Sequence, residues 1–112
     1  MRSLRNSVQL IGNLGMDPDV KEVSNGNKMA RFSLATSETY NNKKGEKVTD
    51  TQWHNLIIWG KLADIAEKYL KKGKQIAVEG KLETNSYDDK EGNRKFYTQV
   101  KVNDFVMLGQ EN

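Results

Sequence analysis

The segment Thr51–Gly60 reads as one β-strand that carries both tryptophans of the chain. Successive side chains of a strand point to opposite faces, so Trp53 and Trp59 lie on the same face, about 20 Å apart. Leu56 and Ile58 lie on the other face and are apolar enough to supply a core. The two indole rings must therefore either fill a second core or remain outside as a platform on which something planar stacks.

Most of the remaining chain also carries strand patterns rather than helical ones. Apolar runs and two-residue alternation indicate five further strands, at Val8–Gly12, Val20–Val23, Lys28–Thr39, Ile76–Tyr87 and Lys95–Asn103. The pair Asn25-Gly26 predicts a tight hairpin between the second and third of these strands. Polar residues at 41–47 indicate a loop, and those at 88–93 indicate the tip of a second hairpin.

One segment follows the helical period. Its apolar residues recur at i, i+3, i+4, i+7 and i+8, and they are Leu62, Ile65, Ala66, Tyr69 and Leu70. Gly73 then supplies a stop signal. We expect this stripe, including Tyr69, to face the core, and we expect Phe32 and Phe96 there as well because they lie on apolar strand faces. The alternation after the helix also places Leu82 on an apolar face.

Length and composition fix the broad class. A chain of 112 residues is expected to form one compact domain. Strands dominate, with one helix before the last pair of strands, and this order suits a small, partly open barrel. The absence of cysteine excludes disulfides and thiolate metal sites. The first residues lack the apolar run of a signal peptide, and no segment reaches membrane-spanning length, so we expect a cytoplasmic protein.

The charges and the remaining aromatic residues suit a polyanionic partner. The net charge is +3, and residues 61–81 hold six lysines against three acidic residues. Tyr40, Tyr87 and Tyr97 lie among polar neighbours, where a core ring is unexpected. Unpaired bases stack on such rings at about 1–3 kcal/mol each, and lysines between the rings neutralise phosphates. This inventory fits single-stranded nucleic acid, with Tyr97 set aside as a candidate subunit contact.

Patterns of catalytic residues are weak. The single histidine, His54, alternates onto the apolar face of its strand, where a core or interface role is expected rather than a general base. The acidic residues Asp88, Asp89 and Glu91 fall at a hairpin tip, where a solvated turn explains them. No phosphate-binding Gly-x-x-x-x-Gly-Lys loop occurs. We therefore expect a protein that is not an enzyme and that uses no metal or cofactor.

Five short blocks give the chain a family resemblance. In order, they are Gly12–Pro18, Leu34–Glu38, Trp53-His54 with Trp59–Ala63, Tyr69–Gly73 and Val78–Gly80. Together they resemble the bacterial single-stranded DNA-binding proteins (SSB), and the similarity runs from about Ser7 to Gly109. The resemblance implies an all-β fold, a five-stranded OB-fold barrel with one α-helix inserted between strands 3 and 4 and with extended β-hairpins. It assigns residues 1–109 to the DNA-binding domain and leaves 110–112 as a short remnant without the acidic tail that recruits replication and repair proteins in relatives.

The resemblance also implies site residues. Family members stack bases on aromatic residues at four positions, which are Tyr40, Trp53, Trp59 and Tyr87 here. The positions that contact phosphates in relatives, or lie near a basic N-terminal segment, correspond to Arg2, Arg5, Lys43, Lys61 and Lys72. His54 matches a position tied to subunit assembly rather than to chemistry.

The implied function is sequence-independent binding and protection of single-stranded DNA in replication, recombination and repair, by a nucleoid-associated homotetramer. Two other interpretations stay open on the residues alone. An OB-fold RNA-binding protein would show the same rings, because stacking does not distinguish the two sugars. A purely structural assembly domain would also carry exposed Tyr and Trp, since subunit interfaces favour both.

Overall fold

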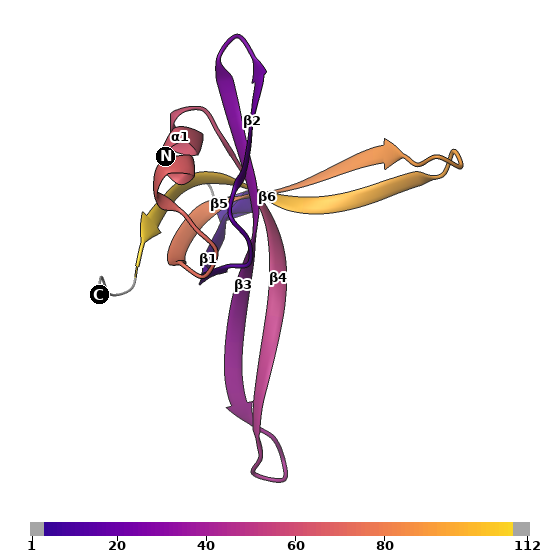
Figure 1. The fold of residues 1–112 in the computed structure, drawn as a ribbon. Coiled ribbons are helices and arrows are strands. Elements are labelled where there is room, and N and C mark those ends of the chain that lie inside the picture. The colour runs from indigo at the N-terminus through magenta and orange to yellow at the C-terminus, as the bar shows by residue number, and fades with distance from the viewer. Residues whose placement is uncertain (1–3, 109–112) are drawn as a thin grey trace.

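The structure is a computed structural model that describes residues 4–108, and Figure 1 shows how its elements are arranged. A short 3-10 turn, η1 (Leu4–Asn6), precedes the first strand. The described residues form six strands: β1 (Val8–Leu14), β2 (Asp19–Ser24), β3 (Asn27–Asn41), β4 (Lys47–Trp59), β5 (Gln75–Asp88) and β6 (Arg94–Met107). One α-helix, α1 (Lys61–Tyr69), connects β4 to β5. Within residues 4–108, no helix has the length and apolar character needed to cross a membrane.

Five of the strands close into a barrel in the order β1-β5-β6-β4-β3. The pairing of Asn13 with Ala35 and of Leu14 with Leu34 joins β1 to β3 and completes the ring. β4 and β6 run parallel, and the other neighbouring strands run antiparallel. β2 pairs with β3 outside the ring. The expected all-β barrel is confirmed, and its helix lies between the third and fourth barrel strands, β4 and β5.

Three β-hairpins extend from the barrel as arms (Figure 1). The β2–β3 hairpin turns at residues 25–26, where both residues have the positive φ that the expected tight turn requires. The β3–β4 hairpin stays paired as far as Asn41 and Lys47, and the β5–β6 hairpin as far as Asp88 and Arg94. Because the outer parts of these strands pair only with each other, they leave the barrel as two-stranded ribbons.

The core is built from alternate residues on the inner faces of the barrel strands. Its strand residues are Leu14, Ala30, Phe32, Leu34, Leu56, Ile58, Ile76, Val78, Val100 and Val102, and all are buried. The alternation predicted for β3 and β4 is therefore confirmed, including the core position of Phe32. Burial of these side chains on one face only is the main force that holds the strands together.

The helix contacts the barrel through a stripe that differs from the predicted one. Ala63 and Ala66 are fully buried, and Leu70, which follows the helix in an extended conformation, is buried as well. Ile65 is exposed and Tyr69 is 56% exposed, so the prediction that Tyr69 belongs to the core is wrong. The two small alanines let the helix backbone lie close to the barrel, and this orientation turns positions 65 and 69 to solvent.

Two further core predictions are wrong on the β5–β6 arm. Phe96 is 68% exposed, and Leu82 is exposed too. Both residues follow the strand alternation. Phe96 lies on the outer part of the arm, where β6 pairs only with β5. Leu82 lies past the last pairing of β5 with β1, although its partner Val100 still pairs with β4. No second layer of the described chain covers either side chain. A β-bulge between Glu79 and Gly80 also shifts the register where the arm begins.

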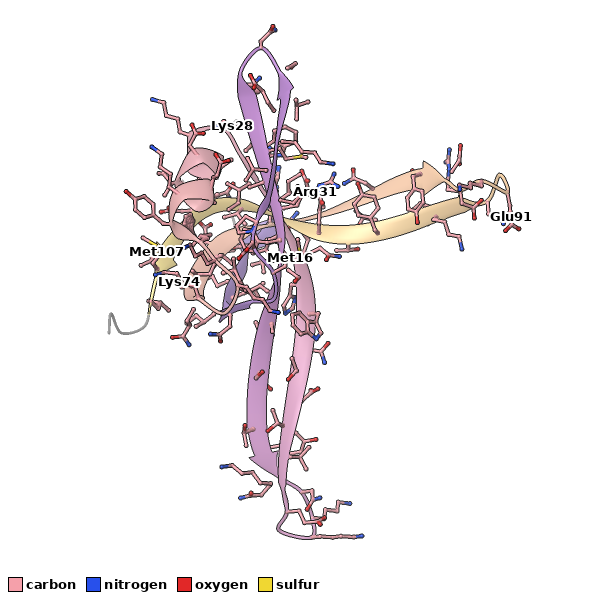
Figure 2. The ribbon with its side chains drawn as sticks, viewed as in Figure 1. Met16, Lys28, Arg31, Lys74, Glu91 and Met107 are labelled. Atoms are coloured by element: carbon pink, nitrogen blue, oxygen red, sulfur yellow. The ribbon has the colours of Figure 1, made fainter. Side chains whose placement is uncertain are left out.

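An ion-pair cluster ties α1 to the start of β3, where Figure 2 labels Lys28. Lys28 Nζ lies 2.9 Å from a carboxylate oxygen of Asp64 and 3.1 Å from one of Glu67. The hydrogen bond to Asp64, together with that to Glu67, raises the pKa of the Lys28 ammonium above its ordinary value of 10.5. Because the three side chains are exposed, solvent screens this contact, and it orients the helix rather than supplying its main attachment.

Gly12 lies where β1 approaches β3, and its lack of a side chain allows that approach. A Cβ at this position would overlap the carbonyl oxygen of Ala35. We expect Gly12→Ala to destabilise the fold by about 1–3 kcal/mol, the cost typical of overpacking. Chemical denaturation would measure the change, with Lys90→Ala at an exposed hairpin tip as the control. An unchanged denaturation midpoint for Gly12→Ala would show that the barrel does not need this close approach.

Candidate nucleic-acid interface

β4 presents both indole rings on the outer face of the barrel. Trp53 is 63% exposed and Trp59 is 42% exposed, whereas Leu56 and Ile58 on the opposite face are buried. The prediction that the two rings point away from the core is confirmed. Water solvates such rings poorly, so each offers a surface on which a flat ligand can stack.

The edge of the Trp53 ring packs against the backbone at Gly15, at one end of this face. The residue that pairs with Trp53 on β3 is Ala35, whose small side chain leaves room beside the ring. Gly15 lies against the ring edge, because a Cβ on Gly15 would overlap Cζ3 of Trp53 and would stand 2.7 Å from Ser33 Oγ. The backbone that follows β1 therefore supports one side of the ring, while the rest of the ring stays open to solvent.

The face between the two indoles holds a hollow. Ile57 is only 3% exposed here, and the residue that pairs with it on β3 is Arg31. Asn55 is exposed and pairs with Ser33. A hollow of about 300 Å³ opens beside them, and its lining includes Asp19, Arg31, Ser33, Asn55, Tyr97 and Gln99. Figure 2 labels Arg31 and Met16, another lining residue, near the point where the arms leave the barrel.

The β5–β6 arm carries a second aromatic group. Tyr87 of β5 and Tyr97 of β6 are both exposed. The register pairs Tyr87 with Lys95 and Tyr97 with Asn85, so the two tyrosines are diagonal neighbours on one face. Their ring centroids lie 6.0 Å apart at an interplanar angle of 52°, a tilted geometry typical of favourable aromatic pairs. The sequence analysis predicts a subunit contact for Tyr97 rather than a stacking role. In the structure Tyr97 lies against Tyr87, a predicted stacking residue.

Tyr40 lies near the end of the β3–β4 arm and is exposed. Its partner on β4 is Val48, whereas the partner of Trp53 is Ala35. Tyr40 and Ala35 are an odd number of residues apart on β3, so strand alternation places Tyr40 on the face of the ribbon opposite to Trp53. The four predicted stacking residues are therefore all exposed, but they occupy three separate places rather than one platform.

The predicted phosphate contacts are exposed and widely spaced. Lys43 lies at the tip of the β3–β4 arm, Lys61 begins α1, and Lys72 lies in the turn that follows the helix. Among residues 4–108, no carboxylate lies within ion-pair distance of these three ammonium groups. Arg5 lies in η1 and is exposed. Arg2 lies outside the described residues.

His54 is partly buried and makes a hydrogen bond with the hydroxyl of Thr36, at 2.9 Å between Nε2 and Oγ1. This contact links β4 to β3 and gives the ring a structural partner. In the described part of the chain, no group of three or more His, Cys, Asp or Glu side chains is placed to hold a metal ion. The surface offers stacking and charge rather than an acid–base arrangement.

Sequence reasoning missed the polar residues of the central hollow, among them Arg31, Asn55 and Gln99. Arg31 and Asn55 stand at outward positions of alternating strands, but an outward polar residue is ordinary by itself. Only the register of β3 against β4 shows that they lie together. Gln99 also alternates outward on β6, yet it is only 9% exposed, because it lies where β4 and β6 meet.

A family model described as the single-strand binding protein family matches residues 5–108 of the chain. The chain belongs to this family. The match covers every strand of the barrel and both long arms, so it includes all of the exposed aromatic residues described above. The family expected from the five sequence blocks is confirmed.

Individual members of the single-strand binding protein family agree with this assignment. The chain is 45% identical over 108 residues to single-stranded DNA-binding protein 1 of Chlorobaculum tepidum. It is 43% identical over 107 residues to a single-stranded DNA-binding protein of Neisseria meningitidis serogroup A. Each alignment covers 96% of this chain, but only 67% and 62% of the respective relatives.

A solved structure extends the comparison to the fold. The structure, described as a Plasmodium falciparum SSB complex with ssDNA, matches with a TM-score of 0.86 and 32% sequence identity. The match covers 97% of this chain and 98% of that chain. The OB-fold expectation is therefore confirmed over the whole barrel and its arms. The chain spans about two thirds of the curated relatives and nearly all of this solved structure.

The contact of the Trp53 ring with Gly15 can be tested in a Trp59→Phe background, which leaves Trp53 as the only tryptophan. We expect Gly15→Ala to displace the Trp53 ring from its contact with residue 15, because the added Cβ overlaps the ring edge. The emission of Trp53 should shift to longer wavelength and acrylamide should quench it more strongly, while the far-UV circular dichroism stays unchanged. Trp59→Phe alone is the reference. Identical emission from the two proteins would show that Gly15 does not support the ring.

Proposed function

We propose that this protein binds and protects single-stranded DNA, largely without regard to sequence. The observation that supports this most directly is the exposure of Trp53 and Trp59 on one face of β4. Every base has a flat apolar face, so each ring contributes about 1–3 kcal/mol whatever the base. Tyr40 and Tyr87 add separate exposed rings for stacking on the two long arms.

Phosphate neutralisation supplies the second part of the mechanism. We assign the phosphate contacts to Arg2, Arg5, Lys43, Lys61 and Lys72. Each neutralised phosphate releases counterions, so the logarithm of affinity falls with the logarithm of salt concentration by about 0.7 per phosphate on a single strand. Stacking and charge neutralisation make and break no covalent bond, so the protein acts as a binder and not as an enzyme.

The proposed substrates are the strands exposed during replication, recombination and repair. A strand whose bases are stacked on the protein cannot pair with its complement, and a covered backbone is less accessible to nucleases. In a bacterium such strands lie in the nucleoid, and both relatives compared above are bacterial. We therefore propose a cytoplasmic, nucleoid-associated location.

We also propose that the protein assembles as a homotetramer. The outer face of β1, β5 and β6 carries Ile11 and Val106, each more than half exposed. The edge of β1 away from β5 has no partner over residues 8–11 in the described chain, so this edge can pair with another strand. His54 offers a second contact on the β3–β4 arm. Two separate self-complementary surfaces are what a tetramer with crossed twofold axes requires.

Titration with oligo-dT tests the binding mechanism, because bases that stack on the indoles should quench tryptophan fluorescence. Trp53→Ala should weaken binding by about 5- to 150-fold, which corresponds to the loss of one stack. Its far-UV circular dichroism should stay unchanged because the ring lies outside the core. Repeating the titration at several salt concentrations gives the salt slope, which Lys43→Met should make shallower by about 0.7.

Tyr69→Ala is a matched control, since Tyr69 is an exposed ring on α1 that we do not assign to the interface. It should bind oligo-dT as the unmodified protein does. If Trp53→Ala and Trp59→Ala both unfold the domain and neither alters binding, the rings are structural and the proposal fails. Equal or tighter binding of oligo-U in competition with oligo-dT would replace the DNA assignment by an RNA one.

Sedimentation tests the assembly. Ile11→Lys and Val106→Lys each place a charge on the apolar face of β1, β5 and β6, so each should convert the tetramer into smaller species. Val23→Lys is the control, because Val23 is also an exposed apolar residue but lies on the β2–β3 hairpin. A monomeric unmodified protein, or a tetramer that survives both substitutions, would contradict the proposed interface.

A further inference from the structure

The hollow between the two indoles, which we name the fork pocket, lies beside the point where β4 and β6 separate. These strands pair only at Leu56 with Val100 and at Ile57 with Lys101, and they then lead into different arms (Figure 1). The fork pocket has a volume of about 300 Å³, near the lower end of the range for small-molecule sites. It is therefore large enough for a single ring system and too small for a long segment of polymer.

Its position places the fork pocket on the path of the proposed strand. Trp53 and Trp59 are six residues apart on β4, or about 20 Å, and Asn55 stands between them at the edge of the pocket. Arg31 lies across from Ile57, between the two rings and closer to Trp59. A strand that stacks on both indoles must carry the intervening nucleotides across this pocket.

The fork pocket combines an unpaired cation, an unpaired anion and an aromatic ring. Arg31 of β3 lies opposite Asp19 of β2 in the strand register, and both residues line the pocket. Over residues 4–108, neither side chain takes part in an ion pair. The donors of the guanidinium and the acceptors of the carboxylate are thus available to a ligand. Tyr97 lines the pocket from β6 and supplies a surface for stacking.

This combination favours a base over a phosphate. A phosphate drawn to Arg31 would also meet the negative carboxylate of Asp19 in the same small hollow, and that repulsion opposes its binding. A base carries no net charge and can satisfy both groups. The Asn55 amide offers both a donor and an acceptor. The Gln99 amide already donates from Nε2 to a carboxylate oxygen of Glu83 at 3.4 Å, so it offers chiefly its acceptor oxygen. A donor beside an acceptor suits a base edge better than a phosphate, which only accepts hydrogen bonds.

Among the four bases, guanine matches the two charged groups. Its O6 and N7 are adjacent acceptors, the pair that arginine contacts with two donors. Its N1–H and N2–H groups are adjacent donors, and a carboxylate accepts both. Adenine replaces the O6 acceptor with a donor, and the pyrimidines lack the second ring that carries N7. We propose that the fork pocket is a guanine-preferring base subsite, with Arg31 and Asp19 on the base edges and Tyr97 on the ring face.

This inference rests on the proposed function, because it needs a strand that crosses β4. It adds a moderate preference for one base to binding that is otherwise general. The test uses tryptophan quenching with an oligo-dT strand and with the same strand carrying one central dG, dA or 7-deaza-dG. The dG strand should bind about fivefold or more tightly than the dA strand, the lower end for one bidentate base contact. The 7-deaza-dG strand, which keeps the ring face but lacks N7, should lose most of that advantage.

Arg31→Lys keeps the positive charge but loses the paired donors, so it should abolish the preference for dG over dA. Tyr69→Ala, away from the pocket, should retain the preference. If Arg31→Gln makes the salt slope shallower by about 0.7, Arg31 contacts a phosphate and the base subsite is wrong. Equal affinity for the dG, dA and 7-deaza-dG strands also overturns it, while oligo-dT binding would leave the proposed function standing. Loss of all binding, in contrast, would remove the proposed function itself.

Discussion

The short parallel contact between β4 and β6 is the constraint on which the shape of this protein depends. Leu56 and Ile57 pair there with Val100 and Lys101, and without that pairing the five strands would form an open sheet. Burial of Leu56 and Val100 in the core holds the contact in place. Because it spans only two positions, both strands leave it at once, and each enters a different arm. One apolar contact thereby closes the barrel and also spreads the exposed aromatic residues over two diverging ribbons.

The strand pattern of the sequence is enough to predict the inner faces of the barrel. Phe32, Leu34, Leu56 and Ile58 follow the two-residue alternation, and all are buried because the barrel covers one face of their strands. The same alternation fails for Phe96. Its strand continues past the barrel, so the pattern persists while the layer that would bury the ring is missing. Alternation reports which side a residue takes, and it carries no information on where the second layer ends.

The helix and the site show two other limits of sequence reasoning. Tyr69 fits the helical period, but the small residues Ala63 and Ala66 determine which face approaches the barrel. Trp53 and Trp59 could be predicted because one strand contains both, and its other face already forms a core. Arg31 and Asn55 belong to different strands, so only their register brings them together. Sequence periodicity describes each strand separately, so it does not show which residues of different strands become neighbours.

The opposite orientations of Tyr40 and Trp53 on the β3–β4 ribbon have a geometric consequence. A polymer that touches both rings cannot lie flat against one side of the protein and must bend around the edge of this ribbon. The length and twist of the ribbon then determine how sharply a bound polymer curves around it. A shorter or longer β3–β4 hairpin would change how much polymer each copy takes up, even if every aromatic residue were kept.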